Sequence, residues 1–418
     1  MKLGYDLKLK DIDTEIGFSF VPNGTPPQVI ELMKDMESPL KIFHDGCYID
    51  KFKLQSPVYQ QLHILDWYDF AGKSYEEKLV DDYDKENYYY PISPFGTSSG
   101  FISMSGVNAT NIQTQINYNF TDSISNKVLK DIEDGYCKIL IDKVSEGHPY
   151  SKKWIKQLHH LLDEKGIPRN KVIYATGNNR FLDDYLLDNS FIDLTNYDNR
   201  INIIELTHYE LEILLTYELV GGWDNDTECR RNKHFISLNH GEKKHRTSLI
   251  DTILNNDFSD KGYFSYVDKG IFLDIESAAD REGGNETLIK WFSGLNHLYA
   301  DSYFNFTTET LFHEPSIRLS EKIFKPVLYQ QPFLMYSAPH MLKKFKEIGY
   351  KTFDKWFDES YDDEFDDEKR LEILNNEVSR LCSLSLDEVD KIYRESKEIL
   401  DYNLNHLLNL KGRVKLPI

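Results

Sequence analysis

Two short segments of the chain combine cations with the start of a helix, a pairing typical of phosphate binding. Residues 239–246 (NHGEKKHR) follow a predicted strand and lead into a predicted helix that Arg246 opens. Ser320, Glu321 and Lys322 begin a second helix, in which serine is a preferred N-cap residue and the charged pair occupies the first turn. Cations and free backbone N–H groups at such positions hold phosphates. A solvated basic turn, and a glutamate that merely complements the helix dipole, are the alternative interpretations.

A third segment carries candidates for a general base. Residues 142–148 (DKVSEGH) follow a short apolar run, and Glu146 beside Gly147 is our first choice for a carboxylate that accepts a proton. His148 could orient it. Asp45, after the apolar residues 40–43, is a second choice for the base. The alternative interpretation, an ordinary loop residue, is the more frequent one for each of these positions.

A metal site is the less favoured chemistry. Asp224 and Asp226 form a D-x-D pattern of the kind that holds a divalent ion on a diphosphate, but such patterns arise by chance in a chain rich in aspartate. The four cysteines are scattered and form no C-x-x-C pair, which argues against a zinc site and a disulfide framework. We therefore expect no metal ligand and no cofactor.

These segments must be positioned by alternating strands and helices. Residues 137–147 and 170–179 read as buried strands that flank an amphipathic helix at 151–166. Strands and helices alternate again later in the chain, with strands predicted at 233–240, 261–268 and 332–338 and helices at 247–256 and 320–330. Strand, helix, strand within about 40 residues is the pattern of a parallel sheet. Ligands bind at the carboxyl ends of such strands, where both cationic segments fall.

The composition sets wider limits. A chain of 418 residues suggests two domains, and 40% hydrophobic residues exclude wholesale disorder. The net charge of −20 argues against a protein that binds long stretches of duplex DNA through its phosphates. Since no stretch approaches 18 apolar residues and the first residues lack the apolar core of a signal peptide, we expect no membrane span and a cytoplasmic protein.

The order of motifs in the second half resembles a known enzyme family. The order is F-I-S-L-N at 235–239, Arg246 at a helix start, a strand ending at Asp268, Y-F-N-F-T-T-E at 303–309, and S-E-K-I-F-K-P at 320–326. It resembles the donor-binding half of the alpha-1,3-fucosyltransferases, and it is also similar to glycosyltransferases of phages and giant viruses. The chain departs from the fucosyltransferase pattern at His240 and at Lys269-Gly270.

The resemblance implies a GT-B architecture, in which two Rossmann-like domains with parallel sheets face a central cleft. We expect an acceptor-binding domain at 1–220, a nucleotide-sugar-binding domain at 221–385, and a C-terminal helix at 386–418 that packs back toward the first domain. In such enzymes the residues matching Arg246 and Lys322 bind the diphosphate, and the residue matching Glu321 binds the ribose. The further donor-binding candidates in these motifs are Asn239, Glu309, Ser320 and Lys325.

The predicted function is that of an inverting, metal-independent glycosyltransferase that moves a sugar from a nucleotide diphosphate to an acceptor hydroxyl on a glycan. A viral origin would place it in the host cytoplasm. A hydroxymethylated base in phage DNA is the alternative acceptor. A non-catalytic nucleotide-sugar-binding protein is the alternative of another class. The sequence does not specify the sugar, the nucleobase or the oligomeric state.

Overall fold

The computed structural model divides the chain into two compact units, the first built from Met1–Leu206 with Val414–Ile418 and the second from Thr207–Arg413. The residues that the structure describes are 1–5, 62–92, 124–144, 149–188, 199–219, 221–222, 227–239, 241–266, 269–273, 295–313 and 316–414. Among these residues, no helix is long and apolar enough to cross a membrane.

The first unit contains a parallel sheet of six strands in the order β2-β1-β3-β4-β5-β6. Its strands are β1 (Lys2–Tyr5), β2 (Glu76–Leu79), β3 (Tyr88–Pro91), β4 (Cys137–Lys143), β5 (Val172–Thr176) and β6 (Asn202–Glu205). In β4, four consecutive residues from Ile139 to Asp142 are buried, and in β5 every residue is buried. Such continuous burial on both faces is expected of central parallel strands.

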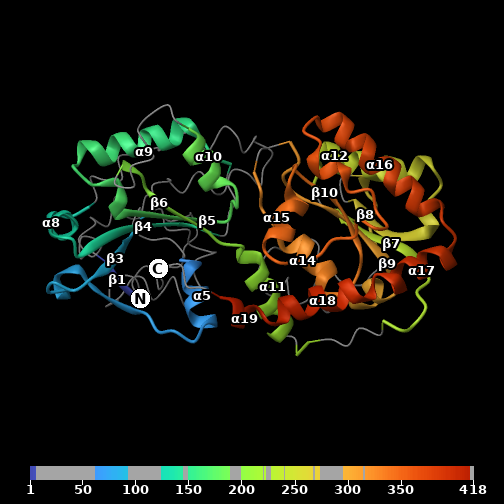
Figure 1. The fold of residues 1–418 in the computed structure, drawn as a ribbon, viewed down its shortest axis with the longest axis horizontal. Coiled ribbons are helices and arrows are strands. Elements are labelled where there is room, and N and C mark those ends of the chain that lie inside the picture. Colours follow the sequence, from blue (N-terminus) through green and yellow to red (C-terminus); the bar gives the residue numbers. More distant parts are fainter. Residues whose placement is uncertain are drawn as a thin grey trace. The chain divides into compact units, whose positions relative to one another are not determined.

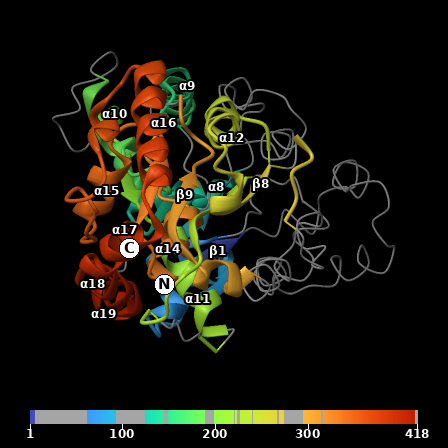
Figure 2. The same cartoon turned by 90° about the vertical axis from the view of Figure 1, so that its right-hand side faces the viewer.

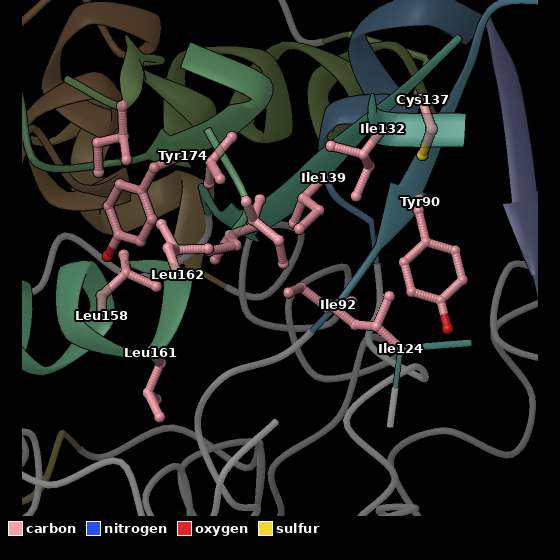
Figure 3. Close-up of a cluster of buried hydrophobic side chains, with 14 of the residues drawn as sticks. Tyr90, Ile92, Ile124, Ile132, Cys137, Ile139, Leu158, Leu161, Leu162 and Tyr174 are labelled. Carbon is pink, nitrogen blue, oxygen red and sulfur yellow. The ribbon is translucent and has the colours of Figure 1, made fainter. Parts of the chain in front are cut away.

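Helices connect these strands and cover the sheet. They are α5 (Ile64–Phe70), α8 (Asn126–Asp134), α9 (Lys152–Glu164) and α10 (Phe181–Leu187), with the 3-10 turns η2 (Val80–Asp82) and η5 (Arg169–Lys171). In Figure 1, α9 and α10 lie above the strands and α5 lies below them. Figure 3 shows how Leu158 and Leu162 of α9 pack toward Tyr174 of β5 in the core. The helix begins where the sequence predicts, because the Ser151 side chain caps it by accepting from the Trp154 N–H.

The second unit contains a parallel sheet of four strands in the order β10-β9-β7-β8. Its strands are β7 (Lys233–Asn239), β8 (Gly262–Tyr266), β9 (Ser302–Thr308) and β10 (Phe333–Tyr336). The chain therefore passes from β7 to β8 on one side and from β9 to β10 on the other. At every β9 position the residue is buried, as expected for a strand with a neighbour on each side.

The helices of the second unit are divided between the two faces of this sheet. They are α11 (His208–Leu219), α12 (Lys244–Asn255), α14 (Glu321–Leu328), α15 (Met341–Glu347), α16 (Asp367–Ser383), α17 (Leu386–Glu395), α18 (Lys397–Leu408) and α19 (Leu410–Arg413), with the 3-10 turns η7 (Ser259–Lys261) and η10 (Ser360–Asp363). In Figures 1 and 2, α12 and α16 lie above the strands, and α14 and α18 lie below them. Opposite faces are the expected outcome of right-handed crossovers that run in opposite directions from the centre of the sheet.

Two predictions about the organisation of the chain differ from the structure. The predicted boundary after residue 220 falls beyond α11, which groups with the second unit because it packs against α14 and α18. Residues 386–413 form three helices rather than one, and these pack on the second unit: α17 contacts β7 and β9, and α18 contacts α14. The mixed α/β class with two parallel sheets is confirmed.

Candidate functional site

The centre of the second sheet is a topological switch point. Strands β7 and β9 lie side by side, and the chain leaves them in opposite directions across the sheet (Figure 1). In open α/β sheets, ligands bind in the crevice that forms beyond the carboxyl ends of two such strands. In this unit that place is beyond Asn239 and Thr308, the last residues of β7 and β9.

Asn239 joins the ends of three strands. Its Oδ1 accepts a hydrogen bond of 2.5 Å from the Thr308 hydroxyl at the end of β9, and its Nδ2 donates to Ser237 Oγ at 3.1 Å. Its backbone N–H donates to the Ser265 hydroxyl of β8 at 3.3 Å. Both the oxygen and the nitrogen of this buried side-chain amide are therefore engaged within the sheet. The structure assigns Asn239 a role in shaping the edge, and a direct contact with a donor stays a prediction.

The first turn of α12 is tied to the end of β9. His245 is buried, and its Nε2–H donates to the Glu309 carbonyl at 2.8 Å while its ring stacks on Phe312 at 4.8 Å between centroids. Burial lowers the pKa of His245 to about 3, so the ring is neutral. Arg246, the next residue, is also buried and donates from Nη1 to the Gly241 carbonyl at 2.9 Å. The predicted phosphate-binding arginine thus lies in the first turn of a helix at the switch point.

Glu309 and Ser320 connect the end of β9 to the start of α14. The Ser320 hydroxyl lies 2.7 and 2.8 Å from the two carboxylate oxygens of Glu309, and it accepts the Lys322 backbone N–H at 3.2 Å. Ser320 is therefore the N-cap residue of α14, as the sequence predicts, and Glu309 fixes the orientation of its hydroxyl. Burial raises the pKa of Glu309, and the nearby charge of Lys322 opposes that rise.

Glu321 and Lys322 are the charged residues of the first α14 turn that remain partly exposed. Lys322 Nζ lies 2.9 Å from Glu321 Oε1, and the side chains are 27% and 21% exposed, respectively. Burial alone would raise the pKa of Glu321, but the charges of Lys322 and Lys325 outweigh it and hold that pKa well below its usual range. Glu321 is thus an ionised acceptor beside a cation that can approach a ligand.

Lys325 and Arg318 add positive charge to the same region. Lys325 follows Glu321 by one helical turn and is 7% exposed, and burial lowers its pKa to about 7. Arg318 hydrogen-bonds to the Tyr209 hydroxyl of α11, and its guanidinium lies 4.8 Å from the centre of that ring. Its charge also acts on Glu309 and Glu321.

Sequence reasoning did not select His245, Arg318 or Tyr209. The available signal was position: His245 precedes Arg246, and Arg318 precedes the N-cap serine by two residues. The contacts of these residues join segments that are 64 and 109 residues apart in the chain. The structure brings Asn239, Glu309, Ser320, Glu321, Lys322 and Lys325 together around one edge of the sheet, and the His245–Glu309 hydrogen bond ties the α12 turn with Arg246 to that edge.

This edge has the chemistry of a site for a phosphorylated, hydroxyl-bearing ligand. Two helices begin there, each with a cation in its first turn, so backbone N–H groups and positive charges lie at the same edge of the sheet. An ionised carboxylate beside Lys322 can accept hydrogen bonds from a pair of hydroxyl groups.

The predicted catalytic residues of the first domain, Glu146, His148 and Asp45, lie outside the described residues. Asp142, at the end of β4, is described and is buried. Its carboxylate accepts the backbone N–H groups of Ile64 at 2.8 Å and Val144 at 3.0 Å, and burial raises its pKa. Both oxygens are therefore used to fix the start of α5 and the end of β4.

The two aspartates considered for a metal, Asp224 and Asp226, lie outside the described residues. The neighbouring histidines of α9 differ from each other: His159 is buried with its Nε2 3.2 Å from the Tyr185 hydroxyl, while His160 is exposed. These contacts make His159 a core residue of the first unit.

Comparisons of the chain with protein-family models, with curated proteins and with solved structures give no match.

Proposed function

We propose that this chain is a glycosyltransferase that transfers a sugar from a nucleotide diphosphate to an acceptor hydroxyl. The observation that carries the proposal is the switch point of the second sheet, where Arg246 and Lys322 occupy the first turns of two helices and Glu321 lies beside Lys322. A diphosphate needs cations and N–H donors, and a ribose needs a hydrogen-bond acceptor for its hydroxyls.

The same groups suit the chemical step. When a sugar leaves a nucleotide, negative charge grows on the departing diphosphate while the sugar passes through a state like an oxocarbenium ion. Fixed cations aimed at that charge lower the barrier. We propose that Arg246 and Lys322 supply these cations without a metal, and that Glu321 orients the nucleotide through its ribose.

The proposal includes a GT-B arrangement and an inverting outcome. The two parallel sheets support the first of these, since each unit alone has the architecture of a Rossmann-like domain. The acceptor hydroxyl would lose its proton to a carboxylate of the first domain, and Glu146 is the proposed base. The proposed acceptor is a glycan.

The test is a thermal-shift screen of the purified protein against UDP, GDP, CMP, dTDP and ADP and their sugars, with and without EDTA. A ligand present at 100 times its Kd stabilises the folded state by about 2.7 kcal/mol, which such a screen detects. We expect a shift with one class of nucleotide diphosphate that survives EDTA. A shift that EDTA abolishes would show that a metal is needed, and no shift with any compound would overturn the proposal.

A further inference from the structure

Arg370, on α16, is fully buried at the carboxyl edge of the second sheet. Its Nε–H donates to the Ser337 carbonyl, directly after β10, at 3.1 Å, and Nη2 donates to the Phe312 carbonyl, four residues after β9, at 2.6 Å. Nη1 donates to the Glu364 carbonyl before α16 at 2.8 Å, and Nη2 also donates to Asp367 at 2.5 Å. One guanidinium therefore joins the segments after β9 and β10 to the start of α16.

The shape of the Arg370 side chain explains why a cation is buried at this position. Arginine is almost never fully buried unless its donors are paired. Three of its partners here are backbone carbonyls, and Asp367 is the carboxylate that accepts from it. The planar fork of the guanidinium spreads its donors widely enough to reach three segments at once, which the single ammonium of a lysine does not.

The contacts of Arg370 continue through an aromatic ring to the first turn of α12. The guanidinium carbon lies 4.2 Å from the centre of the Phe312 ring, and this ring stacks on that of His245 with 4.8 Å between their centres. His245 immediately precedes Arg246 in α12, and its Nε2–H donates to the Glu309 carbonyl at 2.8 Å. Phe312 thus connects Arg370 to the turn that carries Arg246.

The same segment after β9 also reaches the first turn of α14. The Glu309 carboxylate lies 2.7 and 2.8 Å from the Ser320 hydroxyl, which accepts the backbone N–H of Lys322 at 3.2 Å. Residues 309–312 are therefore held at Glu309 by the α14 cap and at Phe312 by Arg370. Both helix starts of the candidate site depend on this short segment.

We propose that Arg370 is a positioning residue of the ligand site: by fixing Phe312 it holds the first turns of α12 and α14, and with them Arg246 and Lys322, in the geometry that a nucleoside diphosphate requires. The inference rests on the proposed function, because it takes the ligand to be a diphosphate. Since Arg370 has no exposed surface, its replacement can affect the ligand only through these other residues.

A second buried arginine of the same unit provides a matched control. Arg231, two residues before β7, is 1% exposed, and its Nη1 donates to the carbonyls of Tyr299 at 3.0 Å and Ser302 at 2.6 Å. Its guanidinium carbon lies 4.3 Å from the centre of the Tyr393 ring. Ser302 is the first residue of β9, so these contacts lie at the amino edge of the sheet. Arg231 therefore has the burial, the carbonyl bonds and the ring contact of Arg370 away from the candidate site.

The experiment is isothermal titration calorimetry of UDP, GDP, dTDP and ADP into the wild-type protein, Arg370→Lys and Arg231→Lys, with urea denaturation of each protein. Lysine keeps the charge but loses the fork, so both variants should be less stable than the wild type by similar amounts. For the nucleotide that the wild type binds, we expect the Kd to rise about 3- to 30-fold in Arg370→Lys, the usual range for a residue that acts without touching the ligand. In Arg231→Lys the Kd should stay unchanged.

A second pair of variants tests the two rings. Phe312→Leu and Tyr393→Leu remove the ring beside each arginine, and they decide the question if a lysine variant does not fold. Only Phe312→Leu should bind the nucleotide more weakly. Wild-type affinity in the Arg370 and Phe312 variants, or an equal loss of affinity in the Arg231 and Tyr393 variants, would overturn the inference and leave the proposed function standing. If the wild type binds none of the four nucleotides, both are overturned.

Discussion

Replacing Lys325 by methionine removes a charge whose burial has a calculable effect on folding. The pKa of this lysine falls from an ordinary 10.5 to about 7 in the folded chain. A lower pKa in the folded state means that the unfolded chain binds the proton more tightly, so stability rises with pH between about 7 and 10.5. At 1.36 kcal/mol per pKa unit, burial of this lysine destabilises the fold by about 5 kcal/mol at pH 6 and by about 2 kcal/mol at pH 9, where the folded chain holds it neutral.

The wild-type protein should therefore gain about 3 kcal/mol from this lysine alone when the pH rises from 6 to 9. Lys325→Met and Lys325→Arg should both lack that gain, since methionine never carries the proton and arginine always does. For each protein, the change in the free energy of unfolding between pH 6 and pH 9 is measured. To a first approximation the other groups titrate alike in all three proteins, so a difference in this change between the wild type and a variant is due to Lys325.

The assay is urea denaturation at pH 6 and at pH 9, followed by hydrogen exchange of peptides from α14 and β9. These peptides report on the second unit and not on the first. A methionine variant whose stability changes with pH as much as that of the wild type would refute the reasoning, because it would mean that Lys325 keeps an ordinary pKa and is in contact with water.

Two further predictions concern other parts of the site. Ser320→Ala removes the N-cap of α14 and a hydrogen bond to the buried Glu309, and should lower the free energy of unfolding by about 1–3 kcal/mol in urea denaturation. Ser385→Ala, at the capping box of α17, is the control, because it removes a helix cap away from the candidate site. It should lower stability by a similar amount without weakening nucleotide binding. If Ser320→Ala and Ser385→Ala change the Kd for the nucleotide equally, the assignment of Ser320 to the donor site is contradicted. Glu146→Ala should lower turnover roughly 10²–10⁴-fold while nucleotide binding stays unchanged, and an active variant would show that another group is the base.

The regular elements could be predicted where the residues themselves carry the signal. Strands β4, β5, β7 and β10 are short apolar runs between polar turns, and the caps Ser151 and Ser320 stand one residue before the helices that they start. Strand β2 escaped prediction because its sequence, EEKL, has no alternation, and it pairs with a single neighbour at the edge of the sheet.

The long C-terminal helix was predicted as one element because no glycine or proline interrupts residues 384–410. Its interruption is local: the Ser396 hydroxyl donates to the Tyr393 carbonyl at 2.8 Å where α17 ends and α18 begins. Side-chain bonds of this kind compete with the helical pattern, and the sequence does not distinguish them from a serine within a helix.

Part of the candidate site could be predicted from the sequence and part could not. Ser320, Glu321 and Lys322 are neighbours in sequence, so their common helix start could be recognised. The stacking of Arg318 on Tyr209 could not be predicted, because this contact depends on the packing of α11 against α14 in the folded unit.

The most direct test of the central claim compares nucleotide binding by three variants at pH 7. Arg246→Ala and Lys322→Ala each remove a cation from the switch point. Lys391→Ala removes a cation that is 76% exposed on α17, a helix whose residue Asp390 bonds to Tyr303 near the amino end of β9.

Isothermal titration calorimetry with the nucleoside diphosphate that gives the largest thermal shift will measure each Kd. A charged hydrogen bond contributes about 1.5–3 kcal/mol, so Arg246→Ala and Lys322→Ala should each raise the Kd by roughly 10- to 150-fold, while Lys391→Ala leaves it unchanged. A protein lacking both Arg246 and Lys322 that still binds the nucleotide with wild-type affinity would contradict the claim that this edge of the second sheet is the donor site.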